Sequence, residues 1–230
     1  MSVTANIARI KPVHVLIAVV LILFALVLFI WLAAPEKHPV PPDMTNAEKK
    51  ERFLELMLPP IRKVASELEA AHQSAEQSIR AGKDLNAMRE EYRAETDQQL
   101  LAALKPHPVS ITLAQAATES AWATSRFFVE ANNVFGVWSF DPDEPRIAAG
   151  SKRGDKTVYV KKFRNLESAV RDYYRVLARG DKFAEFRTMR LSTDDPFQLV
   201  KKLDGYSEIG AQYGEDLAAI IRRNEFQQYD

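Results

Sequence analysis

The feature that most constrains this chain is an unbroken apolar run near its start. Residues 15–34 read VLIAVVLILFALVLFIWLAA, twenty residues without a charged or strongly polar side chain. As an α-helix, a run of this length spans about 30 Å, the thickness of a bilayer core. A helix buried in a soluble core rarely lacks polar residues all round. A cleavable signal peptide usually has an apolar region of only about 7–15 residues. We therefore predict an uncleaved transmembrane signal anchor at 15–34.

The charges beside this run predict its orientation. Arg9 and Lys11 lie just before it, and short basic flanks tend to stay in the cytoplasm. Trp31, near the other end, suits a membrane interface. We expect a single-pass protein of the inner (cytoplasmic) membrane with its N-terminus inside. The rest of the chain would then lie outside, in the periplasm of a two-membrane bacterium.

The charge and cysteine counts exclude several classes of function. The formal net charge of zero is the sum of +2 for residues 1–34 and −2 for the remainder. Because no strong basic field results, we predict no nucleic-acid partner. The chain has no cysteine, and its histidines are scattered, at positions 14, 38, 72 and 107. We predict no metal site and no cofactor, which leaves a mechanism driven by carboxylates.

The region after the apolar run has the composition of a connector. Residues 35–45 hold four of the twelve prolines and predict an extended tether. Thr45 and Glu48 form a capping-box pattern that predicts a helix start. Pro59-Pro60 predict an interruption or a kink of that helix. Further helices are expected at 61–81 and 85–104, and together these helices predict a stalk whose apolar stripes dock onto the next domain.

Two prolines in Lys105-Pro106-His107-Pro108 mark the boundary at which the stalk ends. The residues after this boundary have the length of one compact domain. We therefore divide the chain into a cytoplasmic N-terminus with its transmembrane anchor at 1–34, a tether and helical stalk at 35–105, and a domain at 106–230.

The first residue of chemical interest is Glu119. It lies near the end of an alanine-rich helix that we expect Ser110 to cap. Burial in apolar surroundings and the negative end of a helix both disfavour a carboxylate, so both raise its pKa, as a general acid near neutral pH requires. The alternative is a structural ion pair with Arg126, two turns further along the same face. The residues alone leave these two interpretations open.

A second lobe is predicted after this helix. Turn-forming residues recur between Ser139 and Phe163, and Thr157 to Val160 have strand composition. A hairpin over a helix-borne Glu119 would form a cleft. Glycoside hydrolysis normally needs a second group opposite the acid. The candidates, each of which is more often a solvated turn residue, are Asp141, Asp143, Glu144 and Asp155.

Several motifs together carry a family resemblance. Residues 114–127, AQAATESAWATSRF, resemble the signature AQAAxESxWGTSRF of bacterial glucosaminidase-type peptidoglycan hydrolases. Residues 132–138, NNVFGVW, resemble that family's NNLFGxW. Residues 160–173 and 203–217 are similar to its KFxSxxxSVxxY and GYSxxxxYxxxL segments. FLELMLPPI at 53–61 resembles the helical region before the domain in the Bax-like branch of the family.

This resemblance implies a fold and an activity. The fold would be mainly α: a lysozyme-like helical domain with a small β-hairpin lobe, here preceded by a transmembrane helix and a helical stalk. The activity would be hydrolysis of β-1,4 bonds between N-acetylglucosamine and N-acetylmuramic acid, with peptidoglycan glycan strands as the partner. The family motifs imply that Glu119 is the catalytic acid and that the Tyr206 hydroxyl lies near the sugar.

The second catalytic group stays open. Some family members place a glutamate in the hairpin, which favours Asp155 here, while Tyr159 occupies a strand position where a carboxylate was expected. A core aromatic with a satisfied hydroxyl is the alternative for Tyr206. The residues assigned to substrate binding are Ser120, Asn132, Asn133, Trp138 and Tyr159. For the two asparagines, capping of the following turn is the alternative.

Three other functions compete with hydrolysis. A lytic transglycosylase needs one glutamate only and yields anhydro sugars. A non-catalytic peptidoglycan-binding or scaffold module would explain the uncertain second carboxylate. A membrane-anchored helical interaction protein would explain the charged segment 85–104. The hydrolase ranks first, because it accounts for Glu119 and its motif together.

Overall fold

The computed structural model describes residues 12–153 and 156–230, and its side chains are described for 17–29, 34–150 and 157–230. The chain falls into two units that divide between Glu36 and Lys37. In the first unit, α1 (Pro12–Ala33) is a helix of 22 residues. The side chains of residues 17–29 are exposed along it. Part of the predicted anchor lies outside the residues with described side chains, and within the described part of the chain no helix meets the length and apolarity that a membrane span requires.

The second unit begins with the long helix α2 (Asn46–Arg80). The predicted capping box is confirmed: the Glu48 amide donates to Thr45 Oγ1 at 3.3 Å, and the Thr45 amide donates to Glu48 Oε2 at 2.7 Å. The predicted interruption at Pro59-Pro60 is wrong, because the helix continues through both prolines. Buried Met57 and Ile61 flank the prolines, so tertiary packing offsets the two lost backbone hydrogen bonds.

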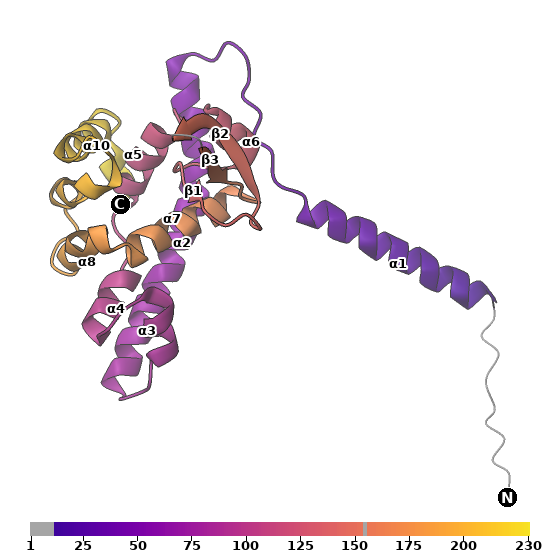
Figure 1. The fold of residues 1–230 in the computed structure, drawn as a ribbon, viewed down its shortest axis with the longest axis horizontal. Helices are drawn as coiled ribbons and strands as arrows, with labels where there is room; N and C mark the ends of the chain where they lie inside the picture. Colours follow the sequence, from indigo (N-terminus) through magenta and orange to yellow (C-terminus); the bar gives the residue numbers. More distant parts are fainter. Residues whose placement is uncertain (1–11, 154–155) are drawn as a thin grey trace, which may run out of the picture. The chain divides into compact units, whose positions relative to one another are not determined.

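The predicted stalk is also wrong as a separate element. Residues 37–230 form one compact unit, and α2 packs along α5 (Val109–Glu119) and α7 (Leu166–Arg179). Four of its buried side chains belong to the central core of the unit; they recur every three or four residues and are Phe53, Met57, Ile61 and Val64. The docking expected of the apolar stripes therefore occurs, but it makes α2 part of the domain rather than a spacer before it (Figure 1).

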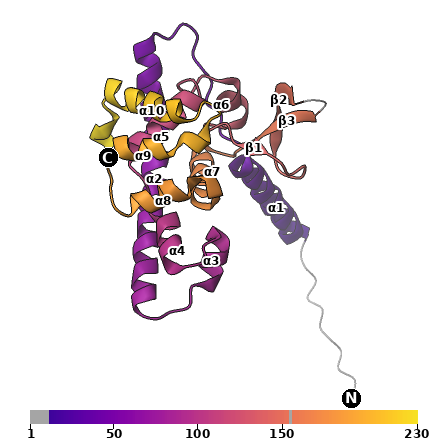
Figure 2. The same ribbon diagram turned by 60° about the vertical axis from the view of Figure 1, so that its left-hand side comes forward.

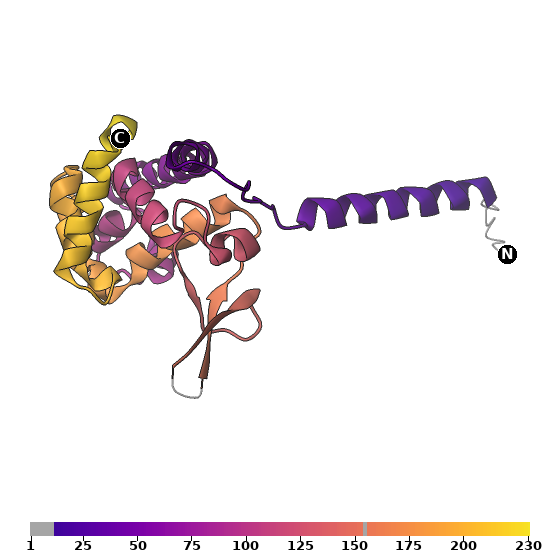
Figure 3. The ribbon, with the colours of Figure 1, turned by 90° about the horizontal axis from the view of Figure 1, so that it is seen from above.

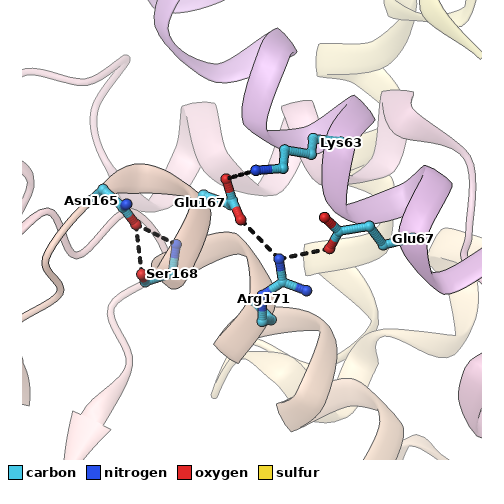
Figure 4. A network of polar contacts seen from close by, with 6 residues as sticks. All are labelled: Lys63, Glu67, Asn165, Glu167, Ser168 and Arg171. Atoms are coloured by element: carbon cyan, nitrogen blue, oxygen red, sulfur yellow. Dashed lines mark hydrogen bonds and ion pairs between the residues drawn. The ribbon is translucent and has the colours of Figure 1, made fainter.

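Ion pairs on the surface also join α2 and α7. Figure 4 shows Lys63 and Glu67 of α2 facing Glu167 and Arg171 of α7 (Leu166–Arg179). Lys63 Nζ lies 2.6 Å from Glu167 Oε2, and Arg171 Nη2 lies 2.6 Å from Glu67 and 2.9 Å from Glu167. Such partly exposed pairs contribute little each, so the apolar contacts beneath them hold α2 in place and the charges favour this register.

The helix predicted over 85–104 is two helices, α3 (Asn86–Tyr92) and α4 (Asp97–Leu104). The break has a local cause: Arg93 ends α3 in the left-handed conformation at φ 54°, and the Thr96 side chain caps α4 by accepting from the Gln99 amide at 3.2 Å. Both helices pack on the second half of α2 in a smaller cluster around Ala75, Leu100 and Leu104.

The centre of the domain is α5 (Val109–Glu119), which runs beside α2 in Figure 1 and is followed by α6 (Arg126–Ala131). The predicted cap Ser110 lies inside the helix, which begins after Pro108. The Ser110 amide and hydroxyl donate instead to the Asp230 carboxylate at 2.7 and 2.9 Å. Most of α5 is fully buried, as its alanine content predicts.

The predicted β lobe is present and includes one more strand than a hairpin. Its strands are β1 (Trp138–Ser139), β2 (Arg146–Arg153) and β3 (Lys156–Lys161), antiparallel in the order β1-β3-β2. Figures 2 and 3 show β2 and β3 projecting away from the helices of the same unit. The mainly helical fold with a small β lobe is therefore confirmed.

The C-terminal part supplies the helices that close the core around α5. They are α7, η1 (Asp181–Phe183), α8 (Ala184–Arg190), α9 (Pro196–Leu199), η2 (Val200–Lys202), η3 (Asp204–Tyr206), α10 (Ala211–Arg223) and η4 (Phe226–Tyr229). Helix α10 contacts α5. This contact brings the GYS and Tyr213 region beside the end of α5.

Candidate active site

Glu119 is the last residue of α5 and is half-buried. Tyr213 of α10 donates its hydroxyl to Glu119 Oε1 at 2.9 Å. Burial raises the pKa of the Glu119 carboxyl above its usual value, and the hydrogen bond from Tyr213 opposes that rise. The alternative ion pair with Arg126 is not formed, since Arg126 donates to Glu130 at 3.0 Å and to the Ala148 carbonyl at 2.7 Å.

The backbone turns sharply after this carboxyl group. Ala121, Trp122 and Ala123 all have positive φ, at 51°, 60° and 61°, a conformation that costs residues with a Cβ about 1 kcal/mol or more each. Ser120 Oγ stabilises the turn by accepting from the Ala123 amide at 2.9 Å. Arg52 of α2 donates to the Ala123 carbonyl at 3.1 Å. The turn thus ends α5 at Glu119 and depends on α2.

One oxygen of Glu119 faces Gly136. A Cβ at position 136 would lie 3.8 Å from Glu119 Oε2, and Gly136 itself has φ +65°. The glycine therefore supplies a left-handed bend and places no side chain against this oxygen. Since Gly136 also lines an open groove, the groove and the carboxyl group adjoin.

This groove has a volume of about 650 Å³ and lies between the β lobe and the C-terminal helices. Aromatic and charged side chains line it. They include Phe135, Trp138, Phe140, Lys182, Tyr206 and Glu208. Phe140 is 84% exposed and Trp138 39% exposed, so the floor near β1 offers apolar surface of the kind that a carbohydrate-binding cleft needs.

Tyr206 lines this groove. Its hydroxyl donates to the Phe135 carbonyl at 3.3 Å, and its ring stacks on that of Tyr213 with centroids 5.5 Å apart. Burial and the charge of Glu119 raise the pKa of Tyr206 well above its usual value. Tyr206 is therefore a neutral hydroxyl beside the catalytic candidate, and it remains a candidate itself.

The predicted binding residues separate into two groups. Trp138 lines the groove. Tyr159 pairs with Ser139, one residue along from the pair of Trp138 with Val160. Neighbours in a strand point to opposite faces, so Tyr159 lies on the other face, with Arg146 4.1 Å above its ring. The binding role predicted for Tyr159 is not supported by this placement.

The three small polar residues have structural roles. Ser120 is fully buried and donates to the Ala116 carbonyl at 2.5 Å. The Asn133 amide group donates to the Val137 and Lys161 carbonyls, both at 2.9 Å, and Asn132 donates to the Phe163 carbonyl at 3.2 Å. Both asparagines are buried. Their predicted substrate contacts are corrected to turn stabilisation, the alternative considered from the sequence.

The second carboxylate is not identified by position. Asp155 lies outside the described residues. Asp141 accepts from the Asp143 amide at 2.9 Å in a turn, and Glu144 lies 3.4 Å from Lys161. Glu208, an exposed residue of the groove lining, was missed because it follows the Tyr206 motif without a pattern of its own. In the described part of the chain, no cluster of three or more ligating side chains could hold a metal ion.

A half-buried carboxyl group with a raised pKa, beside the Gly136 wall of an aromatic groove between two lobes, is an arrangement typical of a glycoside hydrolase. The family model described as mannosyl-glycoprotein endo-beta-N-acetylglucosaminidase matches residues 94–226, more than half of the chain. The chain belongs to this glucosaminidase family. It is thus a glycoside hydrolase whose domain implies a peptidoglycan substrate. The matched region begins within the predicted stalk.

Solved structures provide a second comparison. The catalytic domain of the autolysin Auto from Listeria monocytogenes is 18% identical, with a TM-score of 0.45, over 69% of this chain and 96% of that one. A glycoside hydrolase domain of FlgJ from Salmonella typhimurium is 19% identical, with a TM-score of 0.47, over 77% and 97%. A peptidoglycan hydrolase from Sphingomonas sp. A1 is 20% identical, with a TM-score of 0.44, over 61% and 92%. No curated protein matches the chain.

Proposed function

We propose that this protein cleaves β-1,4 glycosidic bonds next to N-acetylglucosamine in peptidoglycan, with Glu119 as the general acid. The observation that carries the proposal is the state of Glu119: its pKa is raised by burial, and its Oε2 atom faces Gly136, which lines the groove. A raised pKa favours the protonated form of a carboxyl group, which is the form that protonates the leaving-group oxygen of a glycosidic bond.

The groups around Glu119 suit the transition state of this reaction. Positive charge develops on the sugar ring as the bond breaks, and the acid becomes a carboxylate. The Tyr213 hydrogen bond stabilises that carboxylate, and the neutral Tyr206 hydroxyl adds a dipole at the groove wall. Trp138 and Phe140 offer ring faces on which sugar rings stack.

The test is product analysis on purified peptidoglycan with Glu119→Gln. The neutral amide cannot donate the proton, so release of reducing ends should fall by about a thousandfold while the fold is kept. Glu130→Gln is the matched control, because Glu130 is exposed and pairs with Arg126 on α6. Unchanged turnover by Glu119→Gln would remove the assignment. Retained binding of peptidoglycan without turnover by the wild type would favour a binding module.

A lytic transglycosylase is the second candidate, because this reaction needs one carboxyl group alone and no residue is assigned as the second catalytic group. Mass spectrometry of the wild-type products separates the two reactions. Hydrolysis leaves reducing ends, whereas transglycosylation leaves anhydro sugars that are lighter by one water molecule.

We also propose that residues 15–34 anchor the enzyme in the inner membrane, with the N-terminus inside and the catalytic domain in the periplasm. The apolar run and the basic Arg9 and Lys11 support this orientation. The native chain should resist alkaline extraction from membranes, and added protease should reach the domain only from the outer side. The double variant Leu21→Lys and Phe24→Lys should release it. Extraction of the native chain would contradict the anchor.

A further inference from the structure

A row of buried polar side chains leads from Glu119 into the interior of the domain. Tyr213 receives a hydrogen bond from Gln115 Nε2 at 3.0 Å, and Gln115 Oε1 accepts from the Tyr173 hydroxyl at 2.5 Å. Tyr173 lies 3.0 Å from His107 Nε2. The row ends at Arg190, whose Nη1 lies 3.4 Å from His107 Nδ1. These contacts connect the ends of α5 and α8 through the core.

The far end of this row is an unusual charge. Arg190 is 1% exposed, and within the described residues no salt bridge joins it to a carboxylate. Its Nη2 donates to the Ala102 carbonyl at 2.9 Å, and its guanidinium lies 5.0 Å from the Phe186 ring. Burial lowers the pKa of Arg190 to about 10, so the group remains a cation at neutral pH. A buried cation without an acid partner is costly, which calls for an explanation.

The charge determines which way the neighbouring groups donate. A guanidinium only donates hydrogen bonds, so His107 Nδ1 must accept. Burial and the adjacent Arg190 hold the pKa of His107 well below its usual value, so the ring is neutral. Its single proton is therefore on Nε2, which faces Thr112 Oγ1 at 2.9 Å and Tyr173 at 3.0 Å. His107 therefore accepts a hydrogen bond from Arg190 at Nδ1 and donates one to Tyr173 from Nε2.

The other end of the row imposes the same direction. The Glu119 Oε1 atom accepts from Tyr213, so the Tyr213 oxygen is free to accept from Gln115 Nε2. This orientation of the Gln115 amide leaves its Oε1 to accept from Tyr173. Every hydrogen bond of the row then points from the cation toward the carboxyl group, and hydrogen bonds aligned in this way strengthen one another.

We propose that Arg190 is a positioning residue for Glu119: its charge sets the direction of the buried hydrogen-bond chain, which ends on Oε1 and leaves the catalytic proton on Oε2. Oε2 is the oxygen that faces Gly136, which lines the groove. This inference rests on the proposed function of Glu119. It gives the acid one orientation, with the proton always presented on the substrate side.

The other titratable groups around both ends are tyrosines and a second arginine. Tyr173 and Tyr174 of α7 and Arg187 of α8 act on Arg190. Tyr206 of η3 and Tyr213 of α10 face Glu119. Burial raises the pKa of Tyr174 to about 12 and holds that of Tyr173 well above its usual value. Burial also raises the pKa values of Tyr206 and Tyr213. These tyrosines are therefore neutral hydroxyl groups at neutral pH.

Two neighbouring tyrosines provide a matched test. Tyr173 is a member of the hydrogen-bond chain, whereas Tyr174 lies on a side branch of it, 3.1 Å from Thr112 Oγ1. Both tyrosines are buried, and substitution by phenylalanine removes the hydroxyl of each but keeps the ring. In Tyr173→Phe, the Gln115 amide loses its donor and can rotate, so Tyr213 can turn away from Glu119. The alkaline limb of the kcat profile should move up by about half a pH unit, with a several-fold loss of kcat. Tyr174→Phe should leave the limb in place.

The charge itself is tested with Arg190→Met in the full chain. We expect an upward shift of the alkaline limb of about one pH unit. Titration of the Glu119 side-chain carboxyl carbon by NMR should move in the same direction. If Arg190→Met does not fold, the tyrosine pair decides. Equal profiles for Tyr173→Phe and Tyr174→Phe, or a loss of rate at every pH without a shift, would overturn the proposal.

The two proposals fail in different ways. Full activity of Glu119→Gln removes the catalytic role, whatever the chain does. In that case the NMR titration still shows whether Arg190 and Tyr173 control the Glu119 carboxyl group. Loss of activity in Glu119→Gln together with an unmoved Glu119 titration in Tyr173→Phe and Arg190→Met removes the positioning role alone.

Discussion

The two sides of the groove are built in different ways. On the helical side, Glu119 and Tyr206 are hydrogen-bonded and lie against the buried row that ends at Arg190. On the sheet side, Trp138 and Phe140 are 39% and 84% exposed and contact each other with centroids 6.2 Å apart. The group proposed for chemistry is thus fixed by the core, while the rings proposed for binding lie at the solvent-exposed surface.

The largest expected effect compares one substitution on the two sides. Phe53→Ala removes a fully buried ring of α2 that packs edge-on against Trp122, with centroids 5.3 Å apart. It should reduce the free energy of unfolding by about 3–5 kcal/mol. Phe140→Ala should change it by less than about 0.5 kcal/mol. Chemical denaturation of both variants measures the two changes in the free energy of unfolding. Equal losses would contradict the contrast between a buried side and an exposed side.

The second-largest effect is expected on the helical side, where removal of the Tyr213 hydroxyl should change the pH profile and kcat. The hydrogen bond from Tyr213 favours the carboxylate form of Glu119, so Tyr213→Phe raises the Glu119 pKa further. A general acid works while protonated, so the alkaline limb of the pH profile should move to higher pH. We expect kcat to fall about tenfold. Tyr229→Phe is the control. A limb that moves to lower pH would contradict the assigned role.

On the sheet side, Trp138→Ala should weaken binding rather than chemistry. Loss of the exposed ring should raise KM by about tenfold, equivalent to about 1.4 kcal/mol, without shifting the pH profile. Trp138→Phe should restore part of the affinity because it keeps a ring face. Steady-state kinetics on soluble glycan fragments separate the two constants. A change in kcat with constant KM would place Trp138 with the chemical groups.

The smallest effect concerns the turn after Glu119. Ala121 is exposed and has φ 51°, so Ala121→Gly relieves left-handed strain without losing buried surface. It should stabilise the protein by about 0.5–1 kcal/mol. Ala219→Gly, inside α10, should destabilise by about 1 kcal/mol. Thermal unfolding of the pair measures both. A loss of stability in Ala121→Gly would show that this turn stores no strain.

The same contrast explains what the sequence could and could not predict. The family, the mainly helical fold with a β lobe, and the place of Glu119 at a helix end follow from local motifs and periodicity. The assignment of α2 to a stalk failed because its apolar stripe does not reveal which surface covers it. Asn132 and Asn133 were assigned to sugars because a motif marks a residue without showing whether it binds a ligand or the backbone.

The row of hydrogen bonds from Arg190 to Glu119 could not be predicted from the sequence for a related reason. His107, Gln115, Tyr173, Arg190 and Tyr213 come from separate elements, and each has an ordinary local setting. Only the packing of α5, α7, α8 and α10 brings them together. The burial of Arg190 could not be predicted from its sequence neighbours, because arginine is rarely buried without an acid.

The turn after Glu119 has a consequence for the order of events during synthesis. Arg52, which supports the turn, is made long before Glu119, but Tyr213 is made long after it. A growing chain therefore has the acid before it has the groups that orient it. The ability to cut a glycan should appear late and all at once, when the last helices close on α5, and it should vanish as soon as any of them detaches.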